Sequence, residues 1–217
     1  TMALRALIFD FDGLIVDTET PWLELVRDAY RRHGRELPAE IWRQFVGTHR
    51  HPLEHLRELV GPAFDMTAER AALVAGDTRD TLPPCAGVRE LVAAAREAGL
   101  RLGVASSSSL DRVDSELRRL QLRDAFAAVR CRGQNLRAKP APDLYLAALE
   151  DLGTSASEAV VFEDSPTGTR AARAAGIYTV AVPNDVTRGW PFDHADRVID
   201  SLVGVTVPRV RRWLLTP

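Results

Sequence analysis

Ala6-Leu7-Ile8-Phe9-Asp10-Phe11-Asp12-Gly13 is the stretch of this 217-residue chain from which its fold can be predicted. The first four residues are all apolar, as in a parallel strand that is buried on both faces of a sheet. Asp10 follows directly and is expected at the carboxyl end of that strand. Residues two apart in an extended segment point the same way, so Asp10 and Asp12 can flank one ligand. Gly13 lets the backbone turn sharply and approach that ligand closely.

Strand and helix patterns alternate further along the chain. Short apolar runs predict four more strands, at 102–105, 127–131, 159–162 and 177–182. Helical spacing predicts helices between them, at 87–98, 110–120, 143–153 and 165–176. Ser165 and Pro166 suit the N-cap and the first position of the last helix. Repeated strand–helix units of this kind predict an α/β fold with a doubly wound, Rossmann-like parallel sheet.

The segment after the first strand breaks this alternation. It contains four amphipathic helical stretches and no strand run of comparable strength, at 22–33, 40–46, 52–59 and 67–80. We therefore expect residues 16–82 to form an inserted helical cap domain. Residues 1–15 and 83–217 would form the α/β core, with Pro83 and Pro84 stiffening the return connection. The tail from Val205 to Pro217 is expected to pack back on the core.

Composition and charge bound the class of protein. With 46% hydrophobic and 27% charged residues, the chain is typical of a globular protein. The formal net charge of -2 gives no electrostatic case for nucleic acid or an anionic membrane surface. No apolar run approaches the roughly 20 residues of a membrane span, and no export signal is evident. Cys85 and Cys131 lack metal-ligand spacing, so we expect reduced thiols in a cytoplasmic protein.

Reactive side chains fall just after the predicted strands. Ligands of an open parallel sheet bind outside the carboxyl ends of its strands. Asp10, Ser106 and the Glu163-Asp164 pair each follow one strand, and Lys139 lies in the loop after another. Lys139 is the only lysine of the chain, which otherwise uses arginine for positive charge. A lysine offers a compact point charge instead of a planar fork of donors.

These residue types suit phosphoryl transfer. A carboxylate can attack phosphorus when a divalent cation and a lysine neutralise the charge of the phosphate. One of Asp10 and Asp12 would attack, while the other would give a proton to the leaving oxygen and later take one from water. Asp164 would complete an oxygen-only site suited to Mg²⁺.

Four motifs together resemble the haloacid dehalogenase superfamily, in its β-phosphoglucomutase-like branch. They occur in order at 10–19 (DFDGLIVDTE), 105–108 (ASSS), 139–143 (KPAPD) and 162–168 (FEDSPTG). Any one of them would be a weak signal, whereas four in order are specific. The resemblance implies a Mg²⁺-dependent phosphatase that hydrolyses a small phosphorylated metabolite, such as a sugar phosphate. The reaction would pass through a phosphoaspartate.

The resemblance also implies a role for each matching residue. Asp10 would be the nucleophile and a metal ligand, and Asp12 the general acid and base, with its carbonyl on the metal. Lys139 would pair with Asp10 and with the phosphate. The remaining residues would bind the substrate (Gly13, Ser106 and Ser107) or the metal (Asp164, with Glu163 in or just behind its shell). Gly47-Thr48-His49-Arg50 resembles the cap loop whose arginine binds the substrate, so Arg50 is the candidate specificity residue.

Departures from the family narrow the activity. Dehalogenases lack the second aspartate, so Asp12 argues against dehalogenation, and a cap without lysine excludes Schiff-base chemistry. Trp22 stands where the mutase has a histidine, which favours hydrolysis over return of the phosphoryl group to a sugar. Two alternatives stay open: a β-phosphoglucomutase-type sugar-phosphate mutase and a non-enzymatic phospho-acceptor module.

The predicted cap also contains histidines and aromatic residues that need an interpretation. We expect His49, His51 and His55 to be solvated or to contact substrate, with a histidine metal site as the weaker alternative. Trp22, Trp42 and Phe45 are expected in the core of the cap more than in a substrate platform. The protein is expected to be a monomer or a weak homodimer.

Overall fold

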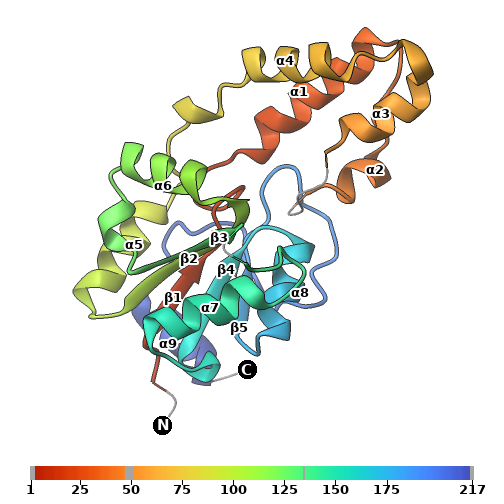
Figure 1. Ribbon diagram of the computed structural model, residues 1–217. Coiled ribbons are helices and arrows are strands. Elements are labelled where there is room, and N and C mark those ends of the chain that lie inside the picture. Colours follow the sequence, from red (N-terminus) through yellow and green to blue (C-terminus); the bar gives the residue numbers. More distant parts are fainter. Residues whose placement is uncertain (1–2, 47–50, 134, 216–217) are drawn as a thin grey trace.

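The computed structural model describes residues 3–46, 51–133 and 135–215 and has the predicted α/β fold (Figure 1). Within these ranges a six-stranded sheet has the order β3-β2-β1-β4-β5-β6, and every neighbouring pair is parallel. Its strands are β1 (Ala6–Phe9), β2 (Arg101–Ser109), β3 (Ala128–Arg132), β4 (Ala159–Glu163), β5 (Tyr178–Ala181) and β6 (Arg197–Val198). The chain runs outward from β1 to β3 on one side and from β4 to β6 on the other. The order therefore reverses between β1 and β4, where open sheets bind ligands.

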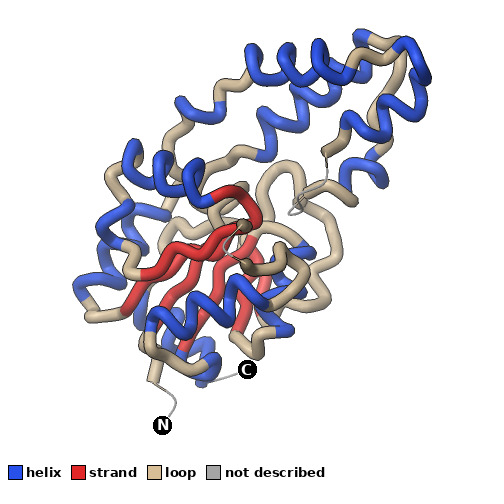
Figure 2. The backbone as a smooth tube through the Cα atoms, viewed as in Figure 1, coloured by secondary structure: helices blue, strands red, loops and turns tan. Residues whose placement is uncertain are grey.

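Side chains of β1 alternate between two hydrophobic clusters, one on each face of the sheet. Leu7 and Phe9 belong to one cluster, and Ala6 and Ile8 to the other. The first face is covered by α5 (Val88–Glu97), α6 (Leu110–Arg119) and α9 (Val207–Leu215), and the second by α7 (Asp143–Leu152) and α8 (Pro166–Ala174). Figure 2 shows the helices on both sides of the sheet. Because both faces are buried, the strands read as continuous apolar runs.

Four helices of the inserted segment lie beyond the carboxyl ends of the strands (Figure 1). They are α1 (Glu19–Arg32), α2 (Ala39–Arg43), α3 (Leu53–Val60) and α4 (Met66–Gly76). Tyr30, Trp42 and Leu56 are among the buried residues of a third hydrophobic cluster, which these helices share. Short 3₁₀ turns are found at Gly61–Ala63, Arg79–Thr81, Arg123–Ala125 and Ala156–Glu158. The four predicted helical stretches are thus present, while the domain limits at 15/16 and 82/83 stay a prediction.

Several predicted limits are wrong, each for a local reason. β2 continues through Ser109 instead of ending at residue 105, because Ser106 still pairs with Cys131 of β3 before the register shifts. α4 ends at Gly76 and not near Asp80. There the Asp77 carboxylate accepts a hydrogen bond from the Arg79 backbone, which competes with continuation of the helix. α2 ends at Arg43, before the predicted Val46, and gives way to tighter turns.

The tail was predicted to pack on the core, and its described part does so. Val210, Trp213 and Leu214 of α9 are buried in the cluster that also contains Phe9. The two-residue strand β6 has too short an apolar pattern to be predicted. Cys85 and Cys131 are free thiols, as expected. None of the described helices has the length and apolar character that crossing a membrane requires.

Phe9 of β1 packs against Phe162 of β4 and against Phe126, which precedes β3, so it should be critical for stability. Its ring is fully buried, stacked on Phe162 with centroids 5.4 Å apart and edge-on to Phe126 at 5.9 Å. We expect Phe9→Ala to lower the free energy of unfolding in urea by about 3–5 kcal/mol, because a large cavity would remain. Leu146→Ala, at a site 48% exposed, is the control and should change it by no more than about 0.5 kcal/mol. Equal losses in both variants would contradict this view of the core.

Candidate active site

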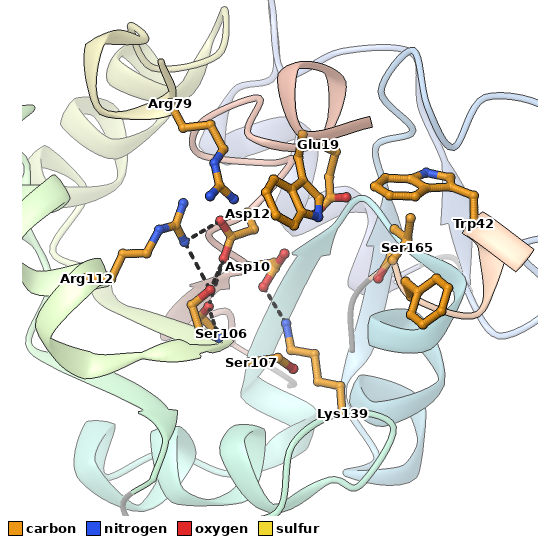
Figure 3. Close-up of a pocket in the computed structure, with 14 residues that line it drawn as sticks. Asp10, Asp12, Glu19, Trp42, Arg79, Ser106, Ser107, Arg112, Lys139 and Ser165 are labelled. Atoms are coloured by element: carbon orange, nitrogen blue, oxygen red, sulfur yellow. Dashed lines mark hydrogen bonds and ion pairs between the residues drawn. The ribbon is translucent and has the colours of Figure 1, made fainter. Parts of the chain in front are cut away.

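A pocket opens between the carboxyl ends of the strands and the inserted helices (Figure 3). The core supplies a polar floor and the inserted segment an aromatic wall. The lining residues are Asp10, Asp12, Glu19, Trp22, Trp42, Phe45, Val46, Arg79, Ser106, Ser107, Ser108, Arg112, Lys139 and Ser165. Sequence segments that were predicted to converge at one edge of the sheet therefore meet around one cavity.

Lys139 lies at the floor of this pocket between two carboxylates. Its Nζ is 2.5 Å from Asp10 Oδ1 and 2.6 Å from Glu163 Oε1, and all three residues are buried. Burial alone would lower the pKa of Lys139, but the charges of Asp10 and Glu163 raise it, so the lysine is firmly protonated. The pairing of Lys139 with Asp10 agrees with the sequence prediction.

Glu163 has both carboxylate oxygens occupied. Oε1 also accepts a hydrogen bond from the Tyr145 hydroxyl at 2.6 Å, while Oε2 accepts from the Ser165 backbone and hydroxyl at 3.2 and 3.1 Å. Gly168 leaves room for this arrangement, since a Cβ there would lie 1.8 Å from Glu163 Oε1. The two oxygens of Glu163 therefore accept four hydrogen bonds in all, one of them from Lys139.

Asp10, Glu163 and Asp164 form the one group in the described parts of the chain that could hold a metal ion. Each is buried and offers a carboxylate oxygen, with these atoms within 4.8 Å of one another. Burial raises the pKa of Asp10 to about 7 although Lys139 opposes this. Burial, Asp10 and Glu163 raise the pKa of Asp164 well above its usual value. One lysine does not balance three buried carboxylates, so an oxygen-seeking divalent cation fits the site.

Asp12 has a different environment and is not part of that acidic group. Its carboxylate accepts hydrogen bonds from Thr18 Oγ1 at 2.8 Å, Ser108 Oγ at 2.6 Å and Arg112 Nη1 at 2.7 Å. Burial raises the pKa of Asp12, but Arg112, Ser108 and Thr18 together bring it below its usual value. Asp12 is therefore ionised as it lies, and Figure 3 shows it turned toward Arg112.

Gly13 brings the backbone against Asp164. Its φ is +83°, and a Cβ there would lie 2.1 Å from Asp164 Oδ2. The sequence predicted that Gly13 allows a close approach to the substrate. In the structure its close neighbours are Asp164 and the side chain of Asn184, whose Nδ2 donates to Asp164 Oδ2 at 2.7 Å and to the Gly13 carbonyl at 3.3 Å.

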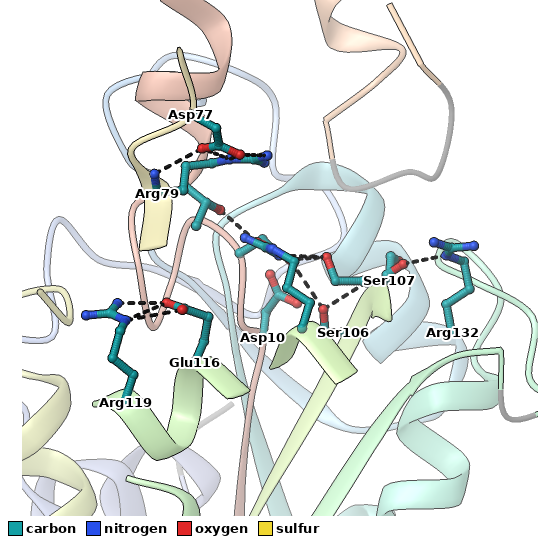
Figure 4. A network of polar contacts seen from close by, with 12 residues as sticks. Asp10, Asp77, Arg79, Ser106, Ser107, Glu116, Arg119 and Arg132 are labelled. Carbon is teal, nitrogen blue, oxygen red and sulfur yellow. Dashed lines mark hydrogen bonds and ion pairs between the residues drawn. The ribbon is translucent and has the colours of Figure 1, made fainter. Parts of the chain in front are cut away.

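Ser106 and Ser107 lie at the floor of the pocket near Lys139 (Figure 3). Ser106 is buried, and its Oγ accepts a hydrogen bond from the Ser108 backbone at 3.0 Å. The Ser107 carbonyl accepts from Arg132 Nε at 3.0 Å, as Figure 4 shows, while its own hydroxyl is buried without a partner. Both serines line the same pocket as Asp10, and their role in binding the substrate stays a prediction.

The cap contributes in ways that the sequence predicted only in part. Arg50 and His49 lie outside the described residues, so the candidate specificity residue has no structural account. Trp42 is buried in the cap cluster and also lines the pocket, and Trp22 and Phe45 share the lining. The tryptophans are therefore both cap core and pocket wall.

His51 and His55, the two of the three singled-out histidines that are described, contact different partners. His51 Nδ1 accepts from the Leu53 backbone at 3.3 Å, and its ring lies edge-on to Trp22. The His55 ring nitrogen is 2.8 Å from the Tyr30 hydroxyl. This arrangement gives the weaker alternative of a histidine metal site no support within the described residues.

Sequence reasoning assigned no role to several residues of the site. Glu19 lines the pocket, and burial with the charges of Asp12 and Asp10 raises its pKa to about 8 although Arg79 opposes this. Arg79 pairs with Asp77 at 2.5 Å (Figure 4) and lies over the Trp22 ring. Glu19 belongs to the first motif and could have been included. Arg79 and Arg112 carry no signal in a chain that is rich in arginine.

Comparison with known proteins identifies the family. The model of the haloacid dehalogenase-like hydrolases matches residues 7–182. YhcW of Bacillus subtilis is 37% identical, with 92% of each chain covered, and hexitol phosphatase B of Escherichia coli strain K12 is 32% identical, with 94% of this chain and 95% of that protein covered. The crystal structure of CbbY from Rhodobacter sphaeroides in complex with phosphate has a TM-score of 0.73 at 25% identity, covering 93% of this chain and 96% of that one. The chain belongs to the haloacid dehalogenase-like hydrolases and is a phosphoric monoester hydrolase.

The raised pKa of Asp10 makes stability depend on pH and on cations. Without a divalent cation the native state keeps its Asp10 proton up to about pH 7, whereas the unfolded chain loses it near 3.8. The free energy of unfolding should therefore fall as the pH rises between these values. A cation binds the ionised carboxylates, so its Kd should be lower at high pH. At one fixed Mg²⁺ concentration, set to 100 times the Kd at about pH 7.5, Mg²⁺ should raise the melting temperature by roughly 5–10 °C at about pH 7.5 and by less at about pH 5. Equal shifts at the two pH values, measured by calorimetry, would contradict this interpretation.

Proposed function

We propose that this hydrolase is a Mg²⁺-dependent phosphatase of small phosphorylated metabolites, with Asp10 as its nucleophile. The observation that carries the proposal is the position of Asp10. Its carboxylate is held by Lys139 at 2.5 Å on the floor of the pocket, next to Asp164. A carboxylate with a lysine on one side and an acidic cation site on the other can meet a phosphate dianion with its charge offset.

The first half of the reaction forms a phosphoaspartate. An oxygen of Asp10 attacks phosphorus while the bond from phosphorus to the ester oxygen breaks, and the leaving oxygen takes a proton from Asp12. Lys139 would stabilise the charge on the phosphoryl oxygens, and the Ser106 hydroxyl and the Ser107 backbone amide would donate hydrogen bonds to them.

The second half returns the enzyme to its starting state. Asp12 takes a proton from water, and the water oxygen attacks phosphorus while the bond from phosphorus to the Asp10 oxygen breaks, which releases inorganic phosphate and the free Asp10 carboxylate. The ionised Asp12 of this structure suits that base step. The acid step needs a protonated Asp12 that faces the leaving oxygen, so its contact with Arg112 must break as the ester binds.

The acidic group supports the metal assignment. Asp10 and Asp164 would bind Mg²⁺ through carboxylate oxygens and Asp12 through its backbone carbonyl, while Glu163 orients Lys139 from behind. A bound Mg²⁺ would draw charge from the phosphoryl oxygens and hold the phosphate in line with the nucleophile. The oxygen-only set of donors favours Mg²⁺ over metals that prefer nitrogen or sulfur.

The pocket wall favours a hydroxylated leaving group. Trp22 and Trp42 offer apolar ring faces, while Arg79 offers hydrogen-bond donors and Glu19 carboxylate oxygens beside them. Such a mixture suits a sugar or a polyol, which presents hydroxyl groups and apolar edges. A relative at 32% identity is named hexitol phosphatase B, which supports a phosphorylated sugar or polyol as the substrate class.

The two alternatives are separable. A sugar-phosphate mutase would need a group that moves a proton to the accepting sugar hydroxyl, and Trp22 stands where the mutases carry a histidine. A phospho-acceptor module would store the phosphoryl group. The acid–base candidate Asp12 two residues from Asp10 promotes turnover instead, and the chain is a member of a family of hydrolases.

The first test is phosphate release with Mg²⁺ across phosphorylated sugars and polyols, with and without glucose 1,6-bisphosphate. We expect release from one or a few esters, lost on chelation and regained when Mg²⁺ is restored. Isomerised sugar phosphate that appears only with the bisphosphate would identify a mutase instead.

Asp10→Asn should lower phosphate release by about three orders of magnitude or more, because the amide is a poor nucleophile. The fold should survive, since the change is isosteric. Asp185→Asn is the matched control, because the Asp185 side chain is 83% exposed. Full activity in Asp10→Asn would refute Asp10 as the nucleophile.

A further inference from the structure

We propose that Asn184 is a positioning residue for the cation site, and that residues 184–190 link this site to the cap. The inference rests on the proposed function in one respect, the assignment of Asp164 as a metal ligand. Asn184 lies after β5, on neither of the strands that carry the acidic group, and belongs to none of the four motifs found in the sequence.

The amide of Asn184 holds Asp164 in place. Its Nδ2 donates to Asp164 Oδ2 at 2.7 Å and to the Gly13 carbonyl at 3.3 Å. Asp164 is 2% exposed, so few water molecules can orient its carboxylate instead. An amide carries no net charge. It therefore orients the carboxylate without neutralising it, whereas a lysine at the same place would compete with the cation for that charge.

The orientation of the amide is fixed by its own surroundings. Asn184 Oδ1 accepts hydrogen bonds from the backbone of Val186 at 3.0 Å and from the backbone and hydroxyl of Thr187 at 3.1 and 3.2 Å. These groups donate to the oxygen, so the nitrogen must be the atom that faces Asp164. The turn from Asn184 to Thr187 thus presets the donor that Asp164 needs.

The same segment contacts the cap. Val186 and Trp190 are partly buried and pack against the hydrophobic cluster of the inserted helices. The guanidinium of Arg43, the last residue of α2, lies 5.6 Å from the centre of the Trp190 ring. In Figure 1 the blue segment after β5 extends toward α2. The contacts with the cap, at Val186 and Trp190, therefore lie two and six positions after the contact of Asn184 with a candidate metal ligand.

Two consequences follow for cation binding. Without the amide, Asp164 can adopt other rotamers, and the cation must restrict them on binding, which weakens its affinity. The position of the cap and the binding of the cation would both depend on this segment. The free energy by which the cap contact favours cation binding then equals the free energy by which cation binding favours the cap contact. Removal of the Trp190 ring, at the cap end, should therefore weaken binding at the metal end.

The test is calorimetric titration of the full chain with Mg²⁺ in wild type, Asn184→Ser, Trp190→Ala and Asp185→Asn. Serine can accept the turn amides as asparagine does but is too short to reach Asp164, so the turn is kept. We expect Asn184→Ser to weaken Mg²⁺ binding about 10- to 100-fold. Trp190→Ala should weaken it about fivefold or more. Asp185→Asn is the control in the same segment and should change the affinity less than about twofold, since an exposed charge is screened.

The melting temperature without Mg²⁺ separates positioning from a structural role. A structural role alone would lower that temperature in Asn184→Ser and leave the Mg²⁺ affinity unchanged, which would overturn the proposal. Unchanged affinity in Trp190→Ala would overturn the link to the cap. A wild type that binds Mg²⁺ but hydrolyses no ester would refute the proposed function and leave this inference intact. A wild type that binds no Mg²⁺ would refute both.

Discussion

The site depends on a buried lysine that is shared by two carboxylates. Lys139 is 3% exposed and lies within 2.6 Å of both Asp10 and Glu163. Removing either carboxylate would leave a desolvated charge with half of its compensation, which is costly in a protein interior. The parallel sheet makes the arrangement feasible, because β1 and β4 are neighbours and Asp10, the residue after β1, follows beside the end of β4 at Glu163. The loop after β3 then has only to bring the lysine across that edge.

The ion pairs of Lys139 also explain how the fold tolerates several buried carboxylates. Glu163 gains a hydroxyl from Tyr145 and two donors from Ser165, so its negative charge is well compensated. Asp10 and Asp164 are not compensated to the same degree, and their pKa values rise as a result. The folded state is therefore destabilised at Asp10 and Asp164, the two carboxylates that a cation and a phosphate would contact. Charged groups with unfavourable surroundings are typical of functional sites.

The sequence predicted the strand-end residues of the site and missed those that reach it from elsewhere. Asp10, Glu163 and Asp164 follow apolar runs, so the rule for parallel sheets was enough to bring them together. Arg112 reaches Asp12 from α6, and Tyr145 reaches Glu163 from α7. Their contributions depend on how each helix packs on the sheet, which the local pattern does not encode. Strand and helix limits failed for a similar reason, since β2 was extended by pairing with β3.

Four acidic residues at or just beyond the carboxyl ends of β1 and β4 differ chiefly in the partner that each has. Asp12 faces an arginine and hydroxyls and stays ionised, which suits a base that removes a proton from water. Both oxygens of Glu163 accept hydrogen bonds, and Lys139 is one of the donors. Asp10 shares that lysine and keeps an oxygen for the pocket. Asp164 has the uncharged amide of Asn184, which orients it and leaves its charge for a cation. Identical carboxylates thus acquire separate roles from their surroundings. A change to Arg112 or Asn184 should therefore alter the role of one carboxylate, whereas a change to Lys139 would affect both Asp10 and Glu163.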